Sequence, residues 1–330
     1  MTASIRILPS PVSTASPHVA ILGDSPAVAR LRGVIEQVAP SEATVLITGE
    51  SGSGKELVAR EIHARSRRAG GPFVAINCAA MPANLLESEL FGHVRGAFTD
   101  ARSARDGLFV QAGAGTLFLD EVGEMPLEMQ AKLLRVVEER AVRPVGSDTT
   151  VPVHVRLITA TNRNLEEELS AHRFRSDLYY RLNVVEIRVP PLRDRGDDIL
   201  LLARWFLLRH ATETGRPAAT LTIEATRCLL DYPWPGNVRE LENCMIRAVT
   251  LSRNPEISVE DLPVRVRGHE EDFTDFPSEV PENLVSMEEL QRRYLVRVLE
   301  AVAGNKTRAA RILAIDRRTL YRLAERLHVT

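Results

Sequence analysis

The residues most able to do chemistry form one glycine-rich run. It reads Gly49-Glu50-Ser51-Gly52-Ser53-Gly54-Lys55-Glu56. Its glycines let successive backbone N–H groups curl around a phosphate chain, and Lys55 would reach the terminal phosphates. We therefore interpret the run as a P-loop that binds the phosphates of a nucleotide, with a glycine-rich turn lacking a ligand as the alternative. Glu56 replaces the Ser or Thr that usually ligates Mg²⁺, so the metal must be held by phosphate oxygens, water and an acid elsewhere.

Two adjacent carboxylates, Asp120 and Glu121, end the apolar run that begins at Gly115. Neighbouring side chains at a strand end point in different directions. Asp120 is therefore predicted to orient hydrated Mg²⁺, and Glu121 to polarise an attacking water. A solvated strand end is the ordinary interpretation of such a pair, but its spacing from the P-loop favours the functional one. Together the two motifs predict hydrolysis of a nucleotide with Mg²⁺ as a cofactor.

Alternating strands and helices must position these motifs. Buried strands are predicted at 45–48, 73–77, 116–120, 156–161 and 184–189. Helical patterns lie between most of them, and this order predicts an α/β fold with a parallel sheet. The pattern turns helical after Pro191, at 197–210, 222–232 and 237–252. These helices predict a small lid that follows the α/β core.

Composition describes a globular protein, with 44% hydrophobic and 26% charged residues among 330. It excludes a disordered chain, a collagen-like repeat and a disulfide miniprotein. The totals of 42 Lys+Arg and 44 Asp+Glu seem to discourage a nucleic-acid partner. Read by segment, however, residues 1–255 have net charge 0, residues 256–284 have −7 and residues 285–330 have +5. An acidic linker therefore separates a neutral body from a basic tail.

These shifts predict a domain organisation and a compartment. The segments are a flexible lead-in at 1–18, an α/β core at 19–190, a lid at 191–255, a linker at 256–284 and a small α domain at 285–330. No apolar run approaches the roughly 18 residues of a membrane span, and the first residues lack a secretory signal. Cys78, Cys228 and Cys244 lack paired spacing and fit reduced thiols. We expect a cytoplasmic protein without a membrane partner.

The basic tail is predicted to bind duplex DNA through a helix-turn-helix. Ser286 and Glu289 form a capping box before a helix. Its predicted apolar stripe consists of Leu290, Tyr294, Val298 and Val302. Gly304-Asn305 then breaks the chain before a short helix at 306–313.

Asp316 is the predicted cap of the last helix, whose inward side chains are Leu320, Leu323 and Leu327. Early residues of such a helix usually supply the contacts to bases. The side chains left for DNA are Lys306, Arg317, Arg318, Thr319, Tyr321 and Arg322. A solvated basic helix face is the alternative, which the +5 charge of the tail disfavours.

Five motifs together resemble the AAA+ domain of bacterial enhancer-binding proteins, the sigma-54-dependent transcriptional activators. Beside the P-loop they are 76–80, 87–93, 96–101 and 234–241. The resemblance covers about residues 19–255 for the ATPase and 285–330 for a Fis-type helix-turn-helix. Glu56 is itself the pattern of this family. The resemblance implies an AAA+ P-loop sheet with a helical lid, followed by a small all-α Fis-type domain.

Two asparagines at strand ends gain roles from this resemblance. Asn77 would be a switch that holds Glu121 away from the attacking water, and an amide can donate to a carboxylate. Strand-end capping is the alternative for Asn77. Asn162, which follows Thr161, would be sensor I and place its amide near the γ-phosphate.

Three arginines also gain roles. Arg175 and Arg181 would be arginine fingers that reach the nucleotide of the neighbouring subunit, where a guanidinium stabilises developing charge. A helix-surface ion pair is the alternative that the residues alone favour. Arg239 would be sensor II, in the first turn of a helix with Asn237 as predicted N-cap.

The segment Gly96-Ala97-Phe98-Thr99-Asp100-Ala101 resembles the loop that this family presses against the sigma factor. Phe98 would supply an apolar contact and Thr99 a polar one, on a backbone able to change conformation. Most relatives have glycine where this chain has Asp100, which adds a charge and restricts the backbone. An ordinary surface loop is the alternative.

The implied function is an activator that assembles as a homo-oligomer, from a dimer to a hexameric ring. It would bind upstream double-stranded DNA and use ATP to remodel sigma-54 RNA polymerase. A regulator that uses nucleotide only to oligomerise is the alternative suggested by Asp100, whereas the basic tail disfavours a remodeller of other substrates. Relatives often carry a receiver or ligand-binding domain before the ATPase. We therefore expect either a regulatory protein acting in trans or a regulatory domain outside this chain.

Overall fold

The chain divides into two compact units, Met1–Arg267 and Gly268–Thr330, in a computed structural model. The structure describes residues 21–97, 103–215, 217–252 and 254–267 of the first unit. Of the second it describes residues 291–292, 294–296, 298–299, 305–313 and 315–327. Each unit has a hydrophobic core of its own.

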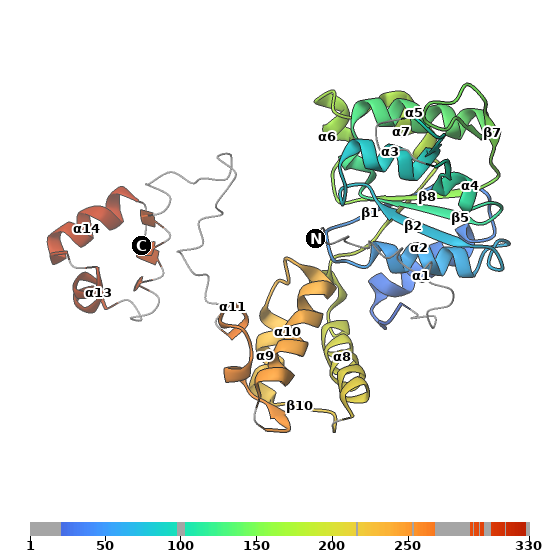
Figure 1. The fold of residues 1–330 in the computed structure, drawn as a ribbon. Coiled ribbons are helices and arrows are strands. Elements are labelled where there is room, and N and C mark those ends of the chain that lie inside the picture. The colour runs from blue at the N-terminus through green and yellow to red at the C-terminus, as the bar shows by residue number, and fades with distance from the viewer. Residues whose placement is uncertain are drawn as a thin grey trace, which may run out of the picture. The chain divides into compact units, whose positions relative to one another are not determined.

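The first unit is built on a parallel sheet of five strands in the order β2-β5-β8-β1-β9 (Figure 1). The strands are β1 (Val45–Thr48), β2 (Phe73–Asn77), β5 (Thr116–Asp120), β8 (Arg156–Thr161) and β9 (Val185–Arg188). Four of them have the predicted bounds, and β9 is one residue shorter at each end. The predicted parallel α/β fold is confirmed.

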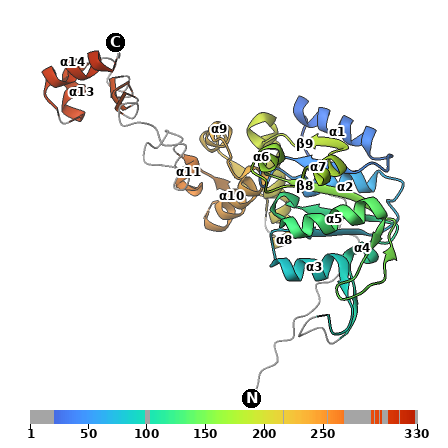
Figure 2. The ribbon, with the colours of Figure 1, turned by 90° about the horizontal axis from the view of Figure 1, so that it is seen from above.

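Helices cover both faces of this sheet because side chains alternate along each strand. In β5, Phe118 packs with α1 (Pro26–Val38) and α2 (Lys55–Ala64), whereas Leu117 and Leu119 pack on the opposite face. Helices α3 (Ala83–Phe91), α5 (Leu127–Glu139) and α7 (Ser176–Leu182) cover that second face. Figure 2 shows α3 and α5 running in similar directions. Burial on both faces explains why the strands read as continuous apolar runs.

Short elements connect the main strands. They are α4 (Leu108–Gln111), α6 (Leu165–Ser170), the 3₁₀ turn η1 (Val122–Glu124), and the antiparallel pairs β3 (Gly92–His93) with β4 (Arg105–Asp106) and β6 (Ala141–Val142) with β7 (Val151–Pro152). The β3–β4 pair brings together the two ends of the predicted sigma-contact loop. Within that loop Gly96 and Ala97 are described, but Phe98, Thr99, Asp100 and Ala101 lie outside the described residues.

The lid begins with the 3₁₀ turn η2 (Leu192–Arg195) and contains three main helices. They are α8 (Asp198–Thr214), α9 (Ile223–Asp231) and α10 (Asn237–Leu251). Their common core includes Trp234, which is fully buried and donates its indole N–H to the Leu229 carbonyl at 2.8 Å. A short parallel pair, β10 (Thr220–Leu221) with β11 (Glu256–Ile257), joins the connection between α8 and α9 to the segment that follows α10.

The lid extends beyond the predicted boundary at residue 255. After β11 it continues through η3 (Val259–Asp261) and α11 (Val264–Arg267). Ile257, Leu262 and Val266 are buried in the lid core, whereas Glu256 and Glu260 are exposed. The prediction of a linker from residue 256 was wrong because net charge does not distinguish an acidic surface from an unfolded acidic segment.

The second unit contains α13 (Lys306–Ile312) and α14 (Arg317–Arg326). Asp316 caps α14 as predicted, since its carboxylate accepts from Thr319 N at 2.9 Å. Leu320 and Leu327 are buried and Leu323 is partly buried, as predicted.

Part of the predicted apolar stripe before these helices is wrong. Val298 is buried, but Tyr294 is 45% exposed, and Leu295 is the buried neighbour instead. Leu290 and Val302 lie outside the described residues, as do Ser286 and Glu289. The error is one of register: the prediction placed Tyr294 in the core, whereas the next residue, Leu295, is the buried one.

Candidate functional site

The P-loop connects the end of β1 to the start of α2, as its sequence predicts. Strand β1 ends at Thr48 and α2 begins at Lys55. Gly54 is the N-cap of α2 with a φ of 104°, a left-handed conformation that favours glycine. The N-terminus of α2 therefore offers backbone N–H groups and positive potential to a phosphate.

Two polar side chains of this loop fit a nucleotide triphosphate. The Lys55 side chain is 6% exposed, and its Nζ donates to the Gly49 carbonyl at 3.0 Å. The Ser53 hydroxyl is buried without a hydrogen-bond partner in the described structure. A buried hydroxyl normally has a partner, and a bound ligand is one way to supply it. ATP binding at this loop is consistent with both observations.

The two carboxylates lie where β5 ends, beside the P-loop. Lys55 Nζ is 3.4 Å from Glu121 Oε1, while Asp120 Oδ2 accepts from Asn77 Nδ2 at 3.2 Å. Burial raises the pKa of Asp120, and the nearby charge of Glu121 raises it further, although Lys55 opposes this. A hard divalent cation relieves such crowding of carboxylate oxygens. The residues therefore fit Mg²⁺, with Asp120 as the predicted ligand through water.

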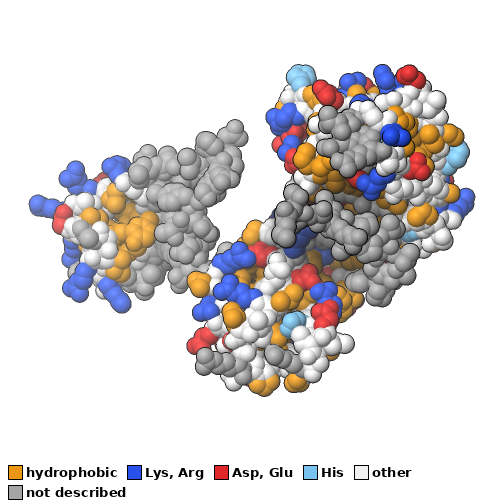
Figure 3. Space-filling model, viewed as in Figure 1, with side chains coloured by type: hydrophobic (Ala, Val, Ile, Leu, Met, Phe, Trp, Pro, Cys, Tyr) orange, Lys and Arg blue, Asp and Glu red, His pale blue; other side chains and the backbone are white. Residues whose placement is uncertain are grey.

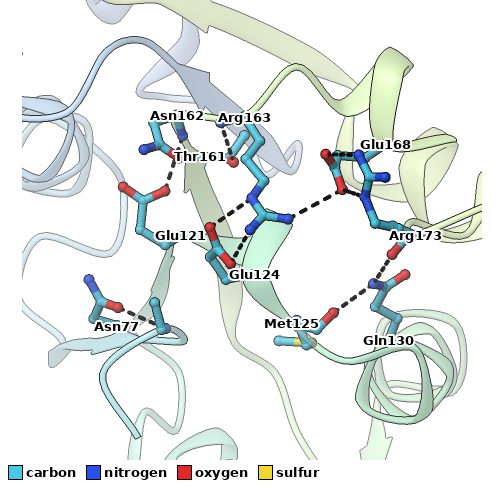
Figure 4. A network of polar contacts seen from close by, with 11 residues as sticks. Asn77, Glu121, Glu124, Met125, Gln130, Thr161, Asn162, Arg163, Glu168 and Arg173 are labelled. Carbon is cyan, nitrogen blue, oxygen red and sulfur yellow. Dashed lines mark hydrogen bonds and ion pairs between the residues drawn. The ribbon is translucent and has the colours of Figure 1, made fainter. Parts of the chain in front are cut away.

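The backbone of Glu121 has a left-handed conformation. Glu121 has a φ of 53°, which is uncommon for a residue with a side chain and occurs more often at functional sites. Its Oε2 accepts from the backbone N–H of Asn162 at 3.1 Å, and Figure 4 shows the two residues facing each other. The predicted sensor I is therefore next to the predicted water-activating residue.

Asn77 has a different partner from the one expected of a switch. Its Nδ2 donates to Asp120, and its Oδ1 accepts from Ala79 N at 2.8 Å. Glu121 is instead held by Lys55 and Asn162. The structure therefore shows a contact of Asn77 with Asp120 in place of the expected contact with Glu121. The reason is the register of β2 on β5, which places Asn77 opposite Asp120.

A network that the sequence analysis missed continues from this site (Figure 4). Arg163, next to Asn162, donates to Glu124 at 2.7 Å and also contacts Glu168. Glu168 in turn accepts two hydrogen bonds of 2.8 Å from Arg173. The one signal in the sequence for this network is the group of glutamates between Arg163 and Arg173.

Gln130 of α5 connects the same network to the predicted arginine fingers. Its side chain is fully buried and donates to the carbonyls of Met125 at 2.7 Å and Arg173 at 3.0 Å. Its Oε1 accepts from Arg175 N at 2.9 Å. The turn after β5 and the segment before α7 are therefore held by one amide.

The predicted fingers themselves are exposed. Arg175 forms two hydrogen bonds with Asp177, at 3.0 and 2.6 Å, and the Arg181 guanidinium is 3.3 Å from Glu138. Their side chains are 43% and 60% exposed. Both pairs match the ion-pair alternative within one subunit, and their exposure leaves the role in a neighbouring subunit as a prediction.

Arg239 of the lid lies against the P-loop. Its backbone N–H donates to the Gly52 carbonyl at 3.3 Å, and that of Val238 does so at 3.0 Å. The prediction of Asn237 as the N-cap of α10 is wrong, because Gly236 is the N-cap. The Glu240 carboxylate accepts a hydrogen bond from Gly236 N at 2.8 Å. Asn237 has φ of 52° and directs its side chain to the P-loop instead.

The candidate DNA site lies in the second unit, where α14 presents a basic surface. Arg317, Arg318 and Arg322 are exposed, and Figure 3 shows basic side chains spread over this unit. Lys306 Nζ lies 4.8 Å and the Arg317 guanidinium 5.8 Å from the centre of the Tyr321 ring. The Thr319 hydroxyl donates to Asp316 at 2.5 Å, so it supports the helix cap. The predicted residues thus lie on and beside α14.

These features define an AAA+ P-loop protein with a helical lid, joined to a Fis-type helix-turn-helix unit. Three family models match the chain: Sigma-54 interaction domain at residues 21–188, AAA+ ATPase lid domain at 193–277, and Bacterial regulatory protein, Fis family, at 286–325. The chain belongs to the sigma-54-dependent transcriptional activators. No helix of the described residues is long and apolar enough to cross a membrane.

Relatives support the same membership. Transcriptional regulatory protein ZraR of Escherichia coli K12 is 50% identical over 311 residues, which are 94% of this chain and 69% of ZraR. Response regulator protein PilR of Pseudomonas aeruginosa is 48% identical over 305 residues, or 92% of this chain and 68% of PilR. The crystal structure of NtrX from Brucella abortus in complex with ATP has a TM-score of 0.69 at 36% identity, covering 93% of this chain and 69% of NtrX.

Proposed function

We propose that this chain hydrolyses ATP in an oligomeric ring and uses that energy to remodel sigma-54 RNA polymerase at a promoter. One observation supports it most: Lys55, Asp120 and Glu121 converge beside the P-loop of a chain with a sigma-54 interaction domain. The complex of NtrX with ATP supports nucleotide binding. Because the polymerase and its DNA are cytoplasmic, this function is exercised in the cytoplasm.

The residues divide the chemistry between them. Lys55 and the P-loop N–H groups bind the phosphates, Asp120 holds Mg²⁺ through water, and Glu121 activates the attacking water. Bound Mg²⁺ supplies charge neutralisation on the phosphate oxygens. Asn162 fixes Glu121 through its backbone N–H. Asn77, which donates to Asp120, acts on the metal-binding carboxylate rather than directly on Glu121.

Two exposed arginines support the proposed ring. Arg175 and Arg181 pair with Asp177 and Glu138 rather than with the P-loop of their own subunit. We assign them to the nucleotide of the neighbouring subunit, where exchange of a surface ion pair costs little. Mixed rings test this role. A subunit with Arg175→Ala should regain turnover beside a Glu121→Gln subunit, and failure to do so would count against it.

Upstream DNA is assigned to α14 of the second unit. Its exposed arginines suit phosphates and guanine edges, and Tyr321 between Lys306 and Arg317 orders part of that surface.

The decisive experiment is open-complex formation by sigma-54 polymerase on supercoiled DNA, with and without ATP. ATP-dependent opening supports the whole proposal. If site-specific DNA binding and nucleotide-dependent oligomerisation remain without sigma-54 binding, the alternative regulator is correct, and Asp100 is the residue to replace with glycine. If the full chain binds no duplex DNA, both functions are wrong.

A further inference from the structure

The outer side of the P-loop is bound by the lid at three consecutive carbonyl groups. The Ser51 carbonyl accepts from Asn237 Nδ2 at 3.1 Å. The Gly52 carbonyl accepts from the first turn of α10, at Val238 N and Arg239 N. The Ser53 carbonyl accepts from the buried guanidinium of Arg195 at 2.6 Å.

These contacts fix the direction of the loop's peptide groups. A peptide plane whose C=O points to the lid has its N–H pointing the other way. The N–H groups of the first and third planes, at Gly52 and Gly54, therefore face the inner side, where a phosphate would bind, whereas the middle one, at Ser53, donates to the Glu50 carbonyl at 3.2 Å. The lid thus takes part in shaping the anion site, even though its side chains approach the loop from outside.

Asn237 is the residue that joins the most parts of this arrangement. It is fully buried, and its Oδ1 accepts from Leu192 N at 2.7 Å, where the chain passes from core to lid. Its Nδ2 donates to Glu50 Oε2 at 3.0 Å as well as to Ser51. One amide therefore contacts the P-loop, the connection η2 and its own helix α10.

Glu50 strengthens the same contact from the P-loop side. Arg193 of η2 donates to its carboxylate twice, at 2.9 and 2.5 Å. The hydrogen bonds from Arg193 and Asn237 lower the pKa of Glu50. Gly52 permits the close approach, because a Cβ there would lie 2.4 Å from the Gly236 carbonyl oxygen. The P-loop and the lid are therefore matched in shape as well as in their polar contacts.

We propose that Asn237 is a positioning residue that holds the start of α10, and with it Arg239, against the nucleotide-binding loop. The proposal rests on the proposed ATP hydrolysis, because Arg239 is the predicted sensor II that would act on the phosphates of that nucleotide. The proposal adds a requirement that the P-loop sequence alone does not reveal. The loop takes the conformation that binds the nucleotide only when the side-chain amide of Asn237 is hydrogen-bonded to Glu50 and Ser51.

Replacing Asn237 with glycine tests this without straining the backbone, since glycine tolerates the φ of 52° at this position. The Asn237→Gly chain should bind a fluorescent ATP analogue about tenfold more weakly, because a buried amide and its partners lose their hydrogen bonds. The amides of Val238 and Arg239 should exchange faster with solvent, both with and without the analogue.

Thr222→Ala is the matched control. Thr222 caps the lid helix α9 by accepting from Ala225 N at 3.1 Å, so its loss weakens the lid away from the P-loop. This variant should lower the melting temperature and leave the affinity for the analogue within about twofold. Equal weakening by Thr222→Ala and Asn237→Gly would show that lid stability alone matters, and would overturn the proposal.

A double-mutant cycle with Arg239→Ala separates positioning from general support. If Asn237 acts through Arg239, the double variant should lose little more of kcat than Arg239→Ala alone. Fully additive losses in kcat, or unchanged binding by Asn237→Gly, would overturn the proposal. ATP turnover by the unmodified chain tests the proposed function separately. The present inference is tested by the affinity of Asn237→Gly for the ATP analogue relative to that of the unmodified chain.

Discussion

Charged groups at the nucleotide site and on helix α14 are held in opposite ways. At the nucleotide site Lys55 is buried and contacts Glu121, and Asp120 accepts from Asn77. On α14 the arginines Arg318 and Arg322 are exposed. Phosphoryl transfer requires charges that are already oriented when the reaction begins. Binding of duplex DNA instead requires cations that reach phosphates and release the counterions around them.

The two regions therefore differ in what a single substitution should do. In the first, removing one group disturbs every residue that it orients, so effects are large and not additive. In the second, each cation contributes separately, and its contribution to DNA affinity falls as the salt concentration rises. The following predictions test this contrast in order of decreasing effect.

The largest effect is expected at Glu121. Glu121→Gln should reduce ATP turnover by at least about 100-fold, because the amide cannot accept the proton of the attacking water. Binding of ATP should persist, since the P-loop contacts remain, and DNA affinity should not change. Single-turnover kinetics and analogue binding measure this. Glu224→Gln, an exposed glutamate in the lid, is the control, and preserved turnover in Glu121→Gln would remove Glu121 as the water-activating residue.

A core substitution in the second unit should abolish DNA binding without affecting the ATPase. Leu320 is 1% exposed, and Leu320→Ala should destabilise this unit by about 2–5 kcal/mol. A small unit has little stability to lose. Fluorescence anisotropy with operator DNA should show lost binding, while ATP turnover is retained. Loss of both activities would show that the two units do not fold independently.

A single exposed cation should have a moderate effect. Arg318→Ala should weaken DNA binding about tenfold if Arg318 contacts a base, and should reduce the salt dependence by about one counterion if it contacts a phosphate. Titrations at several salt concentrations distinguish the two contacts. Arg204→Ala, an exposed arginine of α8, should leave both quantities unchanged. An unchanged affinity in Arg318→Ala would place the DNA elsewhere on the unit.

The smallest effect is expected from thiol labelling. Burial raises the pKa of Cys78 and of Cys244 to about 12, whereas Cys228 is partly exposed. At pH 8 the native chain should therefore react rapidly at Cys228 alone, because a thiolate is the reactive form. All three cysteines lie before residue 268, so Leu320→Ala should leave this pattern unchanged. Rapid labelling of Cys78 in that variant would contradict independent units.

The sequence predicted the main strands and the places of the P-loop and of the Asp120-Glu121 pair at their ends, and the reason is local. The P-loop, the Asp120-Glu121 pair and the strand ends at Asn77 and Asn162 are defined by short patterns whose periodicity also identifies the strands. Parallel strands place their carboxyl ends at one edge of the sheet, which is why these motifs, distant in sequence, meet in the folded chain. The last helix of the tail was predicted for the same reason, through its Asp316 cap and its leucine spacing.

What the sequence could not determine were pairings that depend on register and close approach. Whether Asn77 faces Asp120 or Glu121 is decided by the alignment of β2 with β5 and by the left-handed backbone of Glu121. The role of Gln130 depends on three segments that meet around its amide. The lid beyond residue 255 was missed because burial of Ile257 and Val266 requires the other lid helices.

The sequence by itself determined the chemistry of this protein: a phosphate-binding loop, a pair of carboxylates and a basic helix. The tertiary structure alone decided which of these groups orient one another. The clearest case is Asn237, a predicted helix cap that in the folded chain reaches Glu50 and Ser51, nearly two hundred residues away. Hydrogen bonds are short and directional, so their partners are fixed only when packing brings the segments within about 3 Å.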